Sequence, residues 1–284
     1  MSMTNQASTA PDTIVLIHGL WMTPRSWENW VEHYEKRGYR VLTPAYPGFE
    51  VEVEALRADP TPIATLTIPA TVEYLESVVR GLETPPIIIG HSFGGALTQI
   101  LIDHGLGAAG VAINSVPAEG IRVNPPSQIK SLFPFVRNPL QHDEARGFTH
   151  EQFHYAFTNT ISLEESAKVY ERYHIPAPNR FVWTGILQNV LPGKQDLYVN
   201  YKNDDRAPLL FISGSEDNIM PAPVNKSSYE HHLKSSALTA YKEFPGRSHY
   251  TIGEDGWEAV ADYALEWALD HAAPVGWPGV AASV

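Results

Sequence analysis

The sequence predicts an α/β protein whose mostly parallel, doubly wound sheet is interrupted by an inserted helical segment. Short runs rich in β-branched residues alternate with stretches of helical periodicity along most of the chain. Apolar strands that alternate with helices are typical of a parallel sheet buried on both faces. The alternation stops between residues 116 and 206 and then resumes. We therefore expect one core in two parts, with an insertion between them.

The predicted core comprises residues 13–115 and 207–271. Strands are expected at residues 13–17, 39–43, 87–89, 110–114, 209–213 and 238–244. Helices are expected at residues 24–37, 68–82 and 221–233, directly after Ser92, and at 257–271. The acidic, proline-containing segment 49–67 is expected to be a loop. Residues 1–12 are predicted to be a disordered lead-in and residues 272–284 a frayed tail.

The insertion, residues 116–206, is predicted to form a helical cap without a convincing strand. Two capping boxes, Thr149 with Gln152 and Ser162 with Glu165, predict two short helices there. An insertion at this place lies at the carboxyl edge of the sheet, where loops carry function in open α/β folds. The cap is therefore expected to cover the functional site.

Composition excludes several classes of protein. The chain has 284 residues, of which 43% are hydrophobic and 18% charged, as is ordinary for a folded domain. A net charge of −12 with no basic stripe argues against nucleic acid or an anionic membrane surface as a partner. No cysteine is present, so a disulfide framework and a thiolate site are excluded. No secretory signal and no apolar run that could span a bilayer is visible, so we expect a cytoplasmic protein. The expected partner is a small-molecule substrate. Its oligomeric state is left open.

The strand at residues 87–89 runs directly into Gly90-His91-Ser92-Phe93-Gly94-Gly95. A Gly-x-Ser-x-Gly sequence between a strand and a helix is typical of a nucleophile elbow, in which a sharp turn exposes the serine hydroxyl above the sheet. A serine that only caps the helix is the alternative interpretation. Ser92 is the candidate nucleophile.

A serine hydroxyl needs an adjacent base, and the base needs an orienting carboxylate. In the elbow arrangement these partners follow in the order serine, acid, histidine, each on a loop after a later strand. Asp217 follows the strand at 209–213, and His249 follows the strand that ends near residue 244. Asp217 is preferred over the neighbouring carboxylate of Glu216. Each residue also has an interpretation without catalysis. Asp217 could simply begin a turn, and His249 could be a surface loop residue, one of 12 histidines in the chain.

The oxyanion of an acyl-transfer reaction needs two backbone N–H donors. One should come from Phe93, which follows the candidate nucleophile. The other should come from the loop after the first strand, His18-Gly19-Leu20-Trp21, and Leu20 is the preferred donor.

These segments, together with Gly214-Ser215-Glu216-Asp217 and Gly246-Arg247-Ser248-His249, resemble those of the α/β-hydrolase superfamily. The resemblance extends from about residue 13 to residue 271, and the cap matches in position only. It implies the catalytic triad Ser92, Asp217 and His249, the oxyanion donors Leu20 and Phe93, and no metal or organic cofactor. Epoxide hydrolases and haloalkane dehalogenases share the fold but use an aspartate nucleophile, which this chain lacks at position 92.

His150-Glu151-Gln152-Phe153-His154 fits the zinc-protease pattern H-E-x-x-H. If it bound zinc, Glu151 would act as general base and Glu164, Glu165 or Glu171 could supply a third ligand. The extended pattern fails at Phe157, and Thr149 places His150 in the first turn of a short helix. We therefore favour a cap helix that buries Phe153 and Phe157.

The expected reaction is hydrolysis of a small to medium, largely apolar carboxylic ester through an acyl-enzyme. Candidate substrate-contacting residues are Trp21, His91, Phe153, Phe157 and Trp183, although aromatic cap residues can equally form the cap's own core. The same triad could instead serve a C–C bond hydrolase, a lactonase, an amide hydrolase or a hydroxynitrile lyase. Lyases of this kind in the family usually have a cap lysine aimed at the nitrile, and no motif places Lys130, Lys168, Lys194 or Lys202 there. A slow-turnover ligand receptor is the alternative outside enzymes.

Overall fold

The computed structural model describes residues 10–273, so the expectations for the lead-in and the tail fall mostly outside the described residues. A six-stranded sheet forms the centre of the molecule, and its strand order is β2-β1-β3-β4-β7-β8. Its strands are β1 (Thr13–Ile17), β2 (Arg40–Leu42), β3 (Ile87–His91), β4 (Ala109–Ile113), β7 (Leu209–Gly214) and β8 (Thr239–Phe244). All five neighbouring pairs are parallel, which confirms the predicted sheet.

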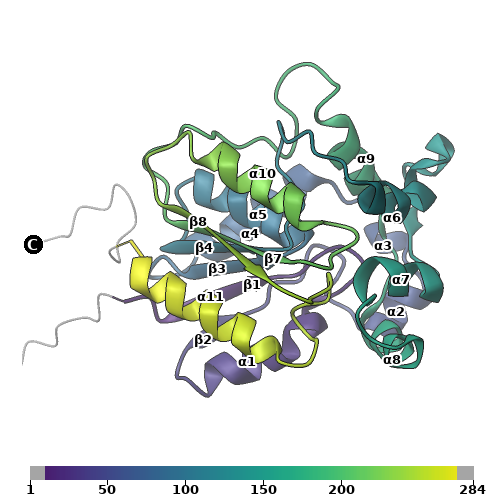
Figure 1. The fold of residues 1–284 in the computed structure, drawn as a ribbon, viewed down its shortest axis with the longest axis horizontal. Helices are drawn as coiled ribbons and strands as arrows, with labels where there is room; N and C mark the ends of the chain where they lie inside the picture. Colours follow the sequence, from purple (N-terminus) through teal and green to yellow (C-terminus); the bar gives the residue numbers. More distant parts are fainter. Residues whose placement is uncertain (1–9, 274–284) are drawn as a thin grey trace, which may run out of the picture.

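Helices cover both faces of this sheet (Figure 1). One face carries α4 (Ile68–Arg80), α5 (Phe93–Asp103) and α10 (Ala222–His232). The other carries α1 (Glu28–Glu35), which follows the 3₁₀ turn Pro24–Trp27, and α11 (Trp257–His271). The central strands β1, β3, β4 and β7 are buried along their whole length, as their apolar sequences require.

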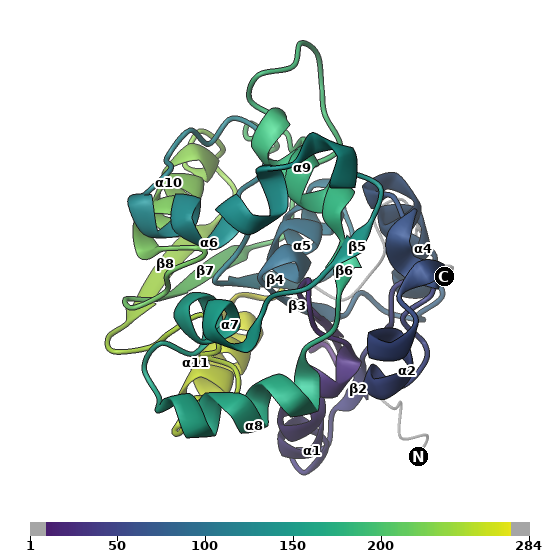
Figure 2. The same ribbon diagram turned by 90° about the vertical axis from the view of Figure 1, so that its right-hand side faces the viewer.

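The chain between β4 and β7 forms a group of helices beyond one end of the sheet, at the right of Figure 1 and facing the viewer in Figure 2. These helices are α6 (Pro126–Val136), α7 (His150–Phe157), α8 (Leu163–Tyr173) and α9 (Asn179–Leu187), with a 3₁₀ turn at Pro139–Gln141. Both predicted capping boxes are formed, at Thr149 and at Ser162. The sequence located α7 and α8 for this reason, whereas α6 and α9 carry no side-chain cap and were not located.

Two expectations were wrong. The segment expected to be a loop contains two short helices, α2 (Val53–Ala58) and α3 (Thr61–Ala64). The insertion also contains a two-residue antiparallel pair, β5 (Ala145–Arg146) with β6 (Ala177–Pro178). Elements of two to six residues are too short to show a periodic pattern. They are stabilised here by tertiary burial, as of Leu56 and Ile63, which are 0% exposed.

Candidate active site

Ser92 lies in the sharp turn between β3 and α5. Its backbone has φ 56° and ψ −117°, a conformation that is strained for a residue with a side chain. Hydrogen bonds hold it from both sides: its N–H donates to Ile113 O at 2.9 Å, and its carbonyl accepts from the N–H groups of Gly95 and Val116, each at 3.0 Å. The turn therefore has the local geometry expected of a nucleophile elbow.

Two glycines allow this turn to fit against its neighbours. A Cβ atom at Gly90 would lie 2.0 Å from Gly94 O, and one at Gly94 would lie 2.1 Å from Ile17 O. Neither separation is possible for a real side chain, and both obstacles are backbone atoms. The strand, the turn and the helix can therefore approach one another only with glycine at these positions.

The structure brings Asp217 and His249 together although they are 32 residues apart. His249 Nδ1 lies 2.6 Å from Asp217 Oδ2, and both side chains are 0% exposed. Asp217 Oδ1 accepts two further bonds, from Ile219 N–H at 2.8 Å and Met220 N–H at 2.7 Å. This geometry fixes the imidazole with Nδ1 protonated and leaves Nε2 free to accept a proton. Glu216 is exposed, so it does not replace Asp217 in this contact.

The loop that carries His249 is fixed next to the serine turn. His91 Nε2 donates to His249 O at 2.8 Å, and Asn114 Nδ2 donates to the same oxygen at 3.2 Å. Burial lowers the pKa of His91 well below its usual value, so His91 is neutral. Within residues 10–273, His249 Nε2 is buried without a hydrogen-bond partner. A serine–histidine bond that tightens only with substrate bound is common in such sites.

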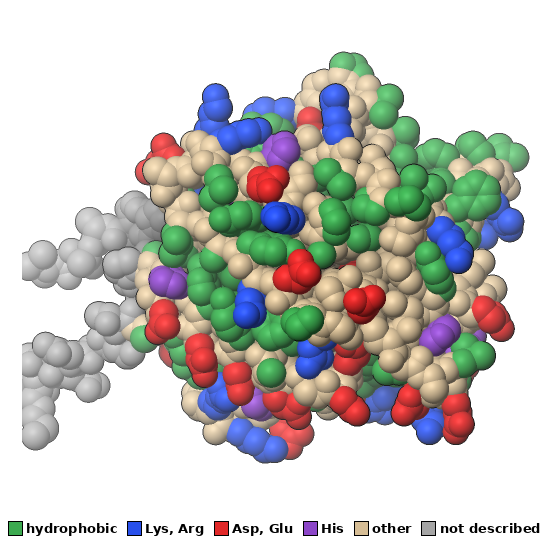
Figure 3. Space-filling view, viewed as in Figure 1, with side chains coloured by type: hydrophobic (Ala, Val, Ile, Leu, Met, Phe, Trp, Pro, Cys, Tyr) green, Lys and Arg blue, Asp and Glu red, His purple; other side chains and the backbone are tan. Residues whose placement is uncertain are grey.

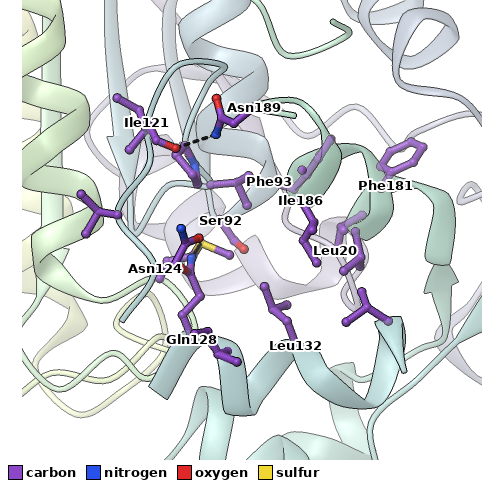
Figure 4. Close-up of a pocket in the computed structure, with 18 of the residues that line it drawn as sticks. Leu20, Ser92, Phe93, Ile121, Asn124, Gln128, Leu132, Phe181, Ile186 and Asn189 are labelled. Atoms are coloured by element: carbon purple, nitrogen blue, oxygen red, sulfur yellow. Dashed lines mark hydrogen bonds between the residues drawn. The ribbon is translucent and has the colours of Figure 1, made fainter. Parts of the chain in front are cut away.

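Both expected oxyanion donors lie beside Ser92. Phe93 is the first residue of α5, and the first N–H groups of a helix have no partner within the helix. Leu20 follows the end of β1, in a loop where a Cβ on Gly19 would lie 2.8 Å from Ser92 Cβ. Both residues line the same cavity as Ser92 (Figure 4).

Ser92 lines a cavity of about 630 Å³ between the core and the inserted helices. Most of its other walls are apolar and come from α6, α9 and the loops before them; they include Val116, Ile121, Leu132, Val136, Phe181, Val182 and Ile186. Ile129 and Phe133 on α6 and Val190 after α9 also line it and are more than half exposed, so its mouth is apolar. Figure 3 shows apolar side chains gathered at the end of the molecule formed by α6 and α9.

Of the five expected substrate-contacting residues, only Trp21 lines this cavity. Phe153 and Phe157 are 0% exposed, and their rings stack with centroids 4.8 Å apart. The ring of Phe157 also packs edge-on against the imidazole of His249, with centroids 4.6 Å apart. Trp183 lies on the side of α9 that faces His142, and His91 supports the His249 loop. These four residues do not line the cavity, so the expectation that they contact substrate is corrected. The sequence shows that a residue is aromatic but not the direction in which its side chain points.

The H-E-x-x-H segment forms α7, with His150 and His154 one turn apart. Within residues 10–273, no group of three or more His, Cys, Asp or Glu side chains is placed to hold a metal ion. The candidate third ligands Glu164, Glu165 and Glu171 are therefore not arranged around α7. The side chains present do not fit a zinc centre.

The four candidate lysines do not line the cavity. Lys130 packs on the ring of Tyr155 at 3.8 Å, and Lys194 packs on Tyr198 at 4.1 Å. Lys168 pairs with Glu164 on the surface. No feature of the cavity therefore favours a lyase that depends on a lysine.

Sequence reasoning missed two residues that support or line the site. Glu254 is 8% exposed, and its Oε1 accepts bonds from Ser248 N–H at 2.9 Å and from Thr160 Oγ1 at 2.8 Å, which ties the His249 loop to the insertion. Gln128 is buried on α6 and lines the cavity. The pair Pro125-Pro126 signals the start of α6, but no sequence spacing tells which face of that helix meets Ser92.

Comparison with known proteins agrees with this fold. The model of the Alpha/beta hydrolase family matches residues 14–263. The chain therefore belongs to the alpha/beta hydrolase family, and hydrolysis is the class of reaction that this membership supports. No curated protein matches the chain.

Solved structures with the same fold include an extracellular α/β-hydrolase from a Paenibacillus species, at 20% identity and a TM-score of 0.64 over 90% of this chain and 98% of that one. A monoacylglycerol lipase from Paleococcus ferrophilus is 17% identical, with a TM-score of 0.62 over 93% and 96%. A structure from a study of carboxylesterases of Nitrososphaera gargenis is 16% identical, with a TM-score of 0.61 over 92% and 90%. At these identities the likeness concerns the fold.

Among residues 10–273 no helix is both long and apolar enough to cross a bilayer. The cytoplasmic location stays a prediction, since one protein of the same fold is described as extracellular.

Proposed function

We propose that this protein is a serine hydrolase that cleaves a small to medium, largely apolar carboxylic ester. The observation that carries the proposal is the buried contact between Asp217 Oδ2 and His249 Nδ1 at 2.6 Å. It leaves Nε2 of His249 without a partner, and the loop of His249 is fixed beside the strained Ser92 turn. An aspartate that orients an imidazole next to a serine hydroxyl that opens onto a substrate cavity is the arrangement that acyl transfer requires. The apolar cavity above Ser92 supports an apolar substrate.

In the proposed mechanism, His249 Nε2 takes the hydroxyl proton of Ser92 as the serine oxygen attacks the ester carbonyl carbon. The carbonyl oxygen becomes an oxyanion that accepts hydrogen bonds from the N–H groups of Leu20 and Phe93. Collapse of this intermediate breaks the bond to the alcohol oxygen, which leaves with the proton from His249. Water, deprotonated by His249, then attacks the acyl-enzyme and releases the acid, and Ser92 recovers its proton.

The test compares wild type with Ser92→Ala on p-nitrophenyl esters of increasing acyl length. We expect kcat to fall at least about 10⁴-fold, because the nucleophile is lost while the fold is kept. A fluorophosphonate probe should add one adduct to Ser92 in the wild type, as judged by peptide mass.

Equal ester hydrolysis by wild type and Ser92→Ala would overturn the proposal. Activity that survives Ser92→Ala but is abolished by a chelator would point to the H-E-x-x-H segment instead. Stoichiometric labelling of Ser92 without turnover on esters, lactones or amides would indicate a ligand receptor with a retained triad.

A further inference from the structure

Gln128 is a buried polar side chain in the wall of an otherwise apolar part of the cavity. It lies on α6, is 6% exposed, and lines the same cavity as Ser92 (Figure 4). Its Nε2 donates to the thioether sulfur of Met220 at 3.5 Å. Thioether sulfur is a weak acceptor, and the described residues supply no other hydrogen-bond partner to this amide. Gln128 thus keeps most of its hydrogen-bonding capacity for a molecule in the cavity.

The other amides of the cavity differ from Gln128. Asn189 accepts from Gly120 N–H at 2.7 Å and donates to Ile121 O at 2.6 Å, so both ends of its side chain are used within the protein (Figure 4). Asn124 is exposed to solvent, which can satisfy it. Gln128 differs from both: its residue is buried, and apart from the Met220 sulfur its amide has no hydrogen-bond partner among the described residues, so its oxygen is left to a molecule in the cavity.

Gln128 is also held in a fixed position close to the reacting groups. Ser131, one turn further along α6, donates to Asn218 O at 3.2 Å. Met220, against which the amide rests, donates its N–H to Asp217 Oδ1 at 2.7 Å. The amide is therefore anchored to the loop that carries the candidate triad acid, in the wall of the cavity that Ser92 also lines.

We propose that Gln128 determines specificity by hydrogen-bonding a hydroxyl group of the substrate, and that the substrate is an apolar ester with a hydroxyl close to the scissile bond. An amide accepts at Oε1 and donates at Nε2, and a hydroxyl can satisfy both atoms at once. The amide is neutral, so it suits an uncharged substituent. This inference rests on the proposed serine-hydrolase function.

The test uses two matched pairs of esters. Methyl octanoate and methyl 3-hydroxyoctanoate place the hydroxyl on the acyl side, whereas propyl octanoate and 3-hydroxypropyl octanoate place it on the alcohol side. The ratio of kcat/KM within each pair is measured for wild type, Gln128→Leu and Gln128→Met. In at least one pair, the preference for the hydroxy ester should fall about five-fold or more in both variants. Labelling of Ser92 by the fluorophosphonate probe and an unchanged circular dichroism spectrum show that both variants are folded.

Asn124→Leu is the matched control, because it removes an amide from the exposed mouth of the same cavity, and it should keep the wild-type preference. Equal preferences in wild type and both Gln128 variants, with hydrolysis still dependent on Ser92, would overturn the hydroxyl inference alone. If wild type shows no Ser92-dependent hydrolysis of any of the four esters, the proposed function fails and this inference fails with it. Should Gln128→Leu not fold, Gln128→Met, of similar length, decides the result.

Discussion

The two halves of the insertion differ in how they meet the core. Helices α7 and α8, which pack against each other, are here called the anchored pair, because α7 and the loop after it are tied by hydrogen bonds to the loops of Asp217 and His249. Tyr250 N–H donates to Phe157 O at 2.9 Å, and Asn218 Nδ2 donates to Tyr155 O at 2.9 Å. Asn159 Nδ2 in turn donates to Glu216 O at 2.9 Å. The anchored pair therefore holds the reacting groups in place.

Helices α6 and α9, here the cavity pair, pack against each other and form most of the apolar wall above Ser92. Several of their large apolar side chains stay exposed, among them Phe133 at 57%. The contrast teaches that one insertion serves two purposes: α7 and the loop after it bond both the acid loop and the histidine loop, whereas the cavity pair, in which only α6 bonds the acid loop, supplies most of the apolar side chains that shape the space for a substrate. Substitutions in the two halves should therefore have separable effects.

The largest loss of activity is expected on substitution of Asp217, the acid whose loop the anchored pair holds. Asp217→Asn should lower kcat about 10⁴-fold, because an amide favours the wrong imidazole tautomer of His249. Steady-state kinetics on a p-nitrophenyl ester measure this loss. Glu216→Gln is the control, since its exposed neighbouring carboxylate should be dispensable. A larger loss in Glu216→Gln than in Asp217→Asn would reverse the assignment of the acid.

Acid should destabilise the fold through its buried histidines, and His174 at the end of α8 is the one that belongs to the anchored pair. Burial, together with the charge of Arg57, lowers the pKa of His174 from its ordinary value of 6.5 to about 3, so the folded protein keeps this histidine neutral. Stability is then fully present above pH 6.5 and is lost as the pH falls towards 3, because the unfolded chain binds the extra proton. The loss is about 1.4 kcal/mol for each pH unit in this window.

Thermal unfolding between pH 8 and pH 4 tests this effect in wild type and His174→Gln. The variant should show a shallower loss of stability with acid, and the difference between the two proteins at pH 8 serves as the reference. Helices α6 and α9 contain no histidine, so the cavity pair contributes nothing to the slope. Identical slopes in the two proteins would contradict the prediction.

A pair of matched amide deletions compares the two halves directly. Asn159→Ala removes a bond from the anchored pair to the acid loop, and Gln188→Ala removes a bond from the end of α9 to Pro117 O. Each should cost about 1 kcal/mol of stability. We expect Asn159→Ala to lower kcat about five-fold with little change in KM, and Gln188→Ala mainly to raise KM. The same split between kcat and KM in both variants would remove the functional distinction between the halves.

The smallest effect is expected at the mouth of the cavity. Ile129→Ser and Phe133→Ser should change stability by no more than about 0.5 kcal/mol, because both side chains are already more than half exposed. KM for long-chain esters should rise a few-fold, while KM for acetate esters should stay the same. Leu140→Ser, at a residue that is 91% exposed and away from the cavity, is the control. A similar rise in KM for this control would show a nonspecific effect.

Most of the core could be predicted because its signals are local. A run such as Ile87-Ile88-Ile89 favours a buried strand, and the glycines around Ser92 favour a close turn. The order of serine, acid and histidine follows from the order of parallel strands whose carboxyl ends meet at one edge. The capping boxes located α7 and α8 for the same reason, since a cap involves only residues three apart in sequence.

What only the tertiary structure decided is the direction of the side chains in the insertion. Phe153, Phe157 and Trp183 looked equivalent to cavity residues in sequence, yet they pack elsewhere, whereas Gln128 and Leu132 line the cavity together with Ser92. Packing of α6 against α9 and against the Met220 loop sets these directions, through contacts between residues more than 40 positions apart. The sequence alone determined the candidate chemistry of the site, because that chemistry follows the strand ends. The shape of the cavity depends on long-range packing, which no local pattern encodes.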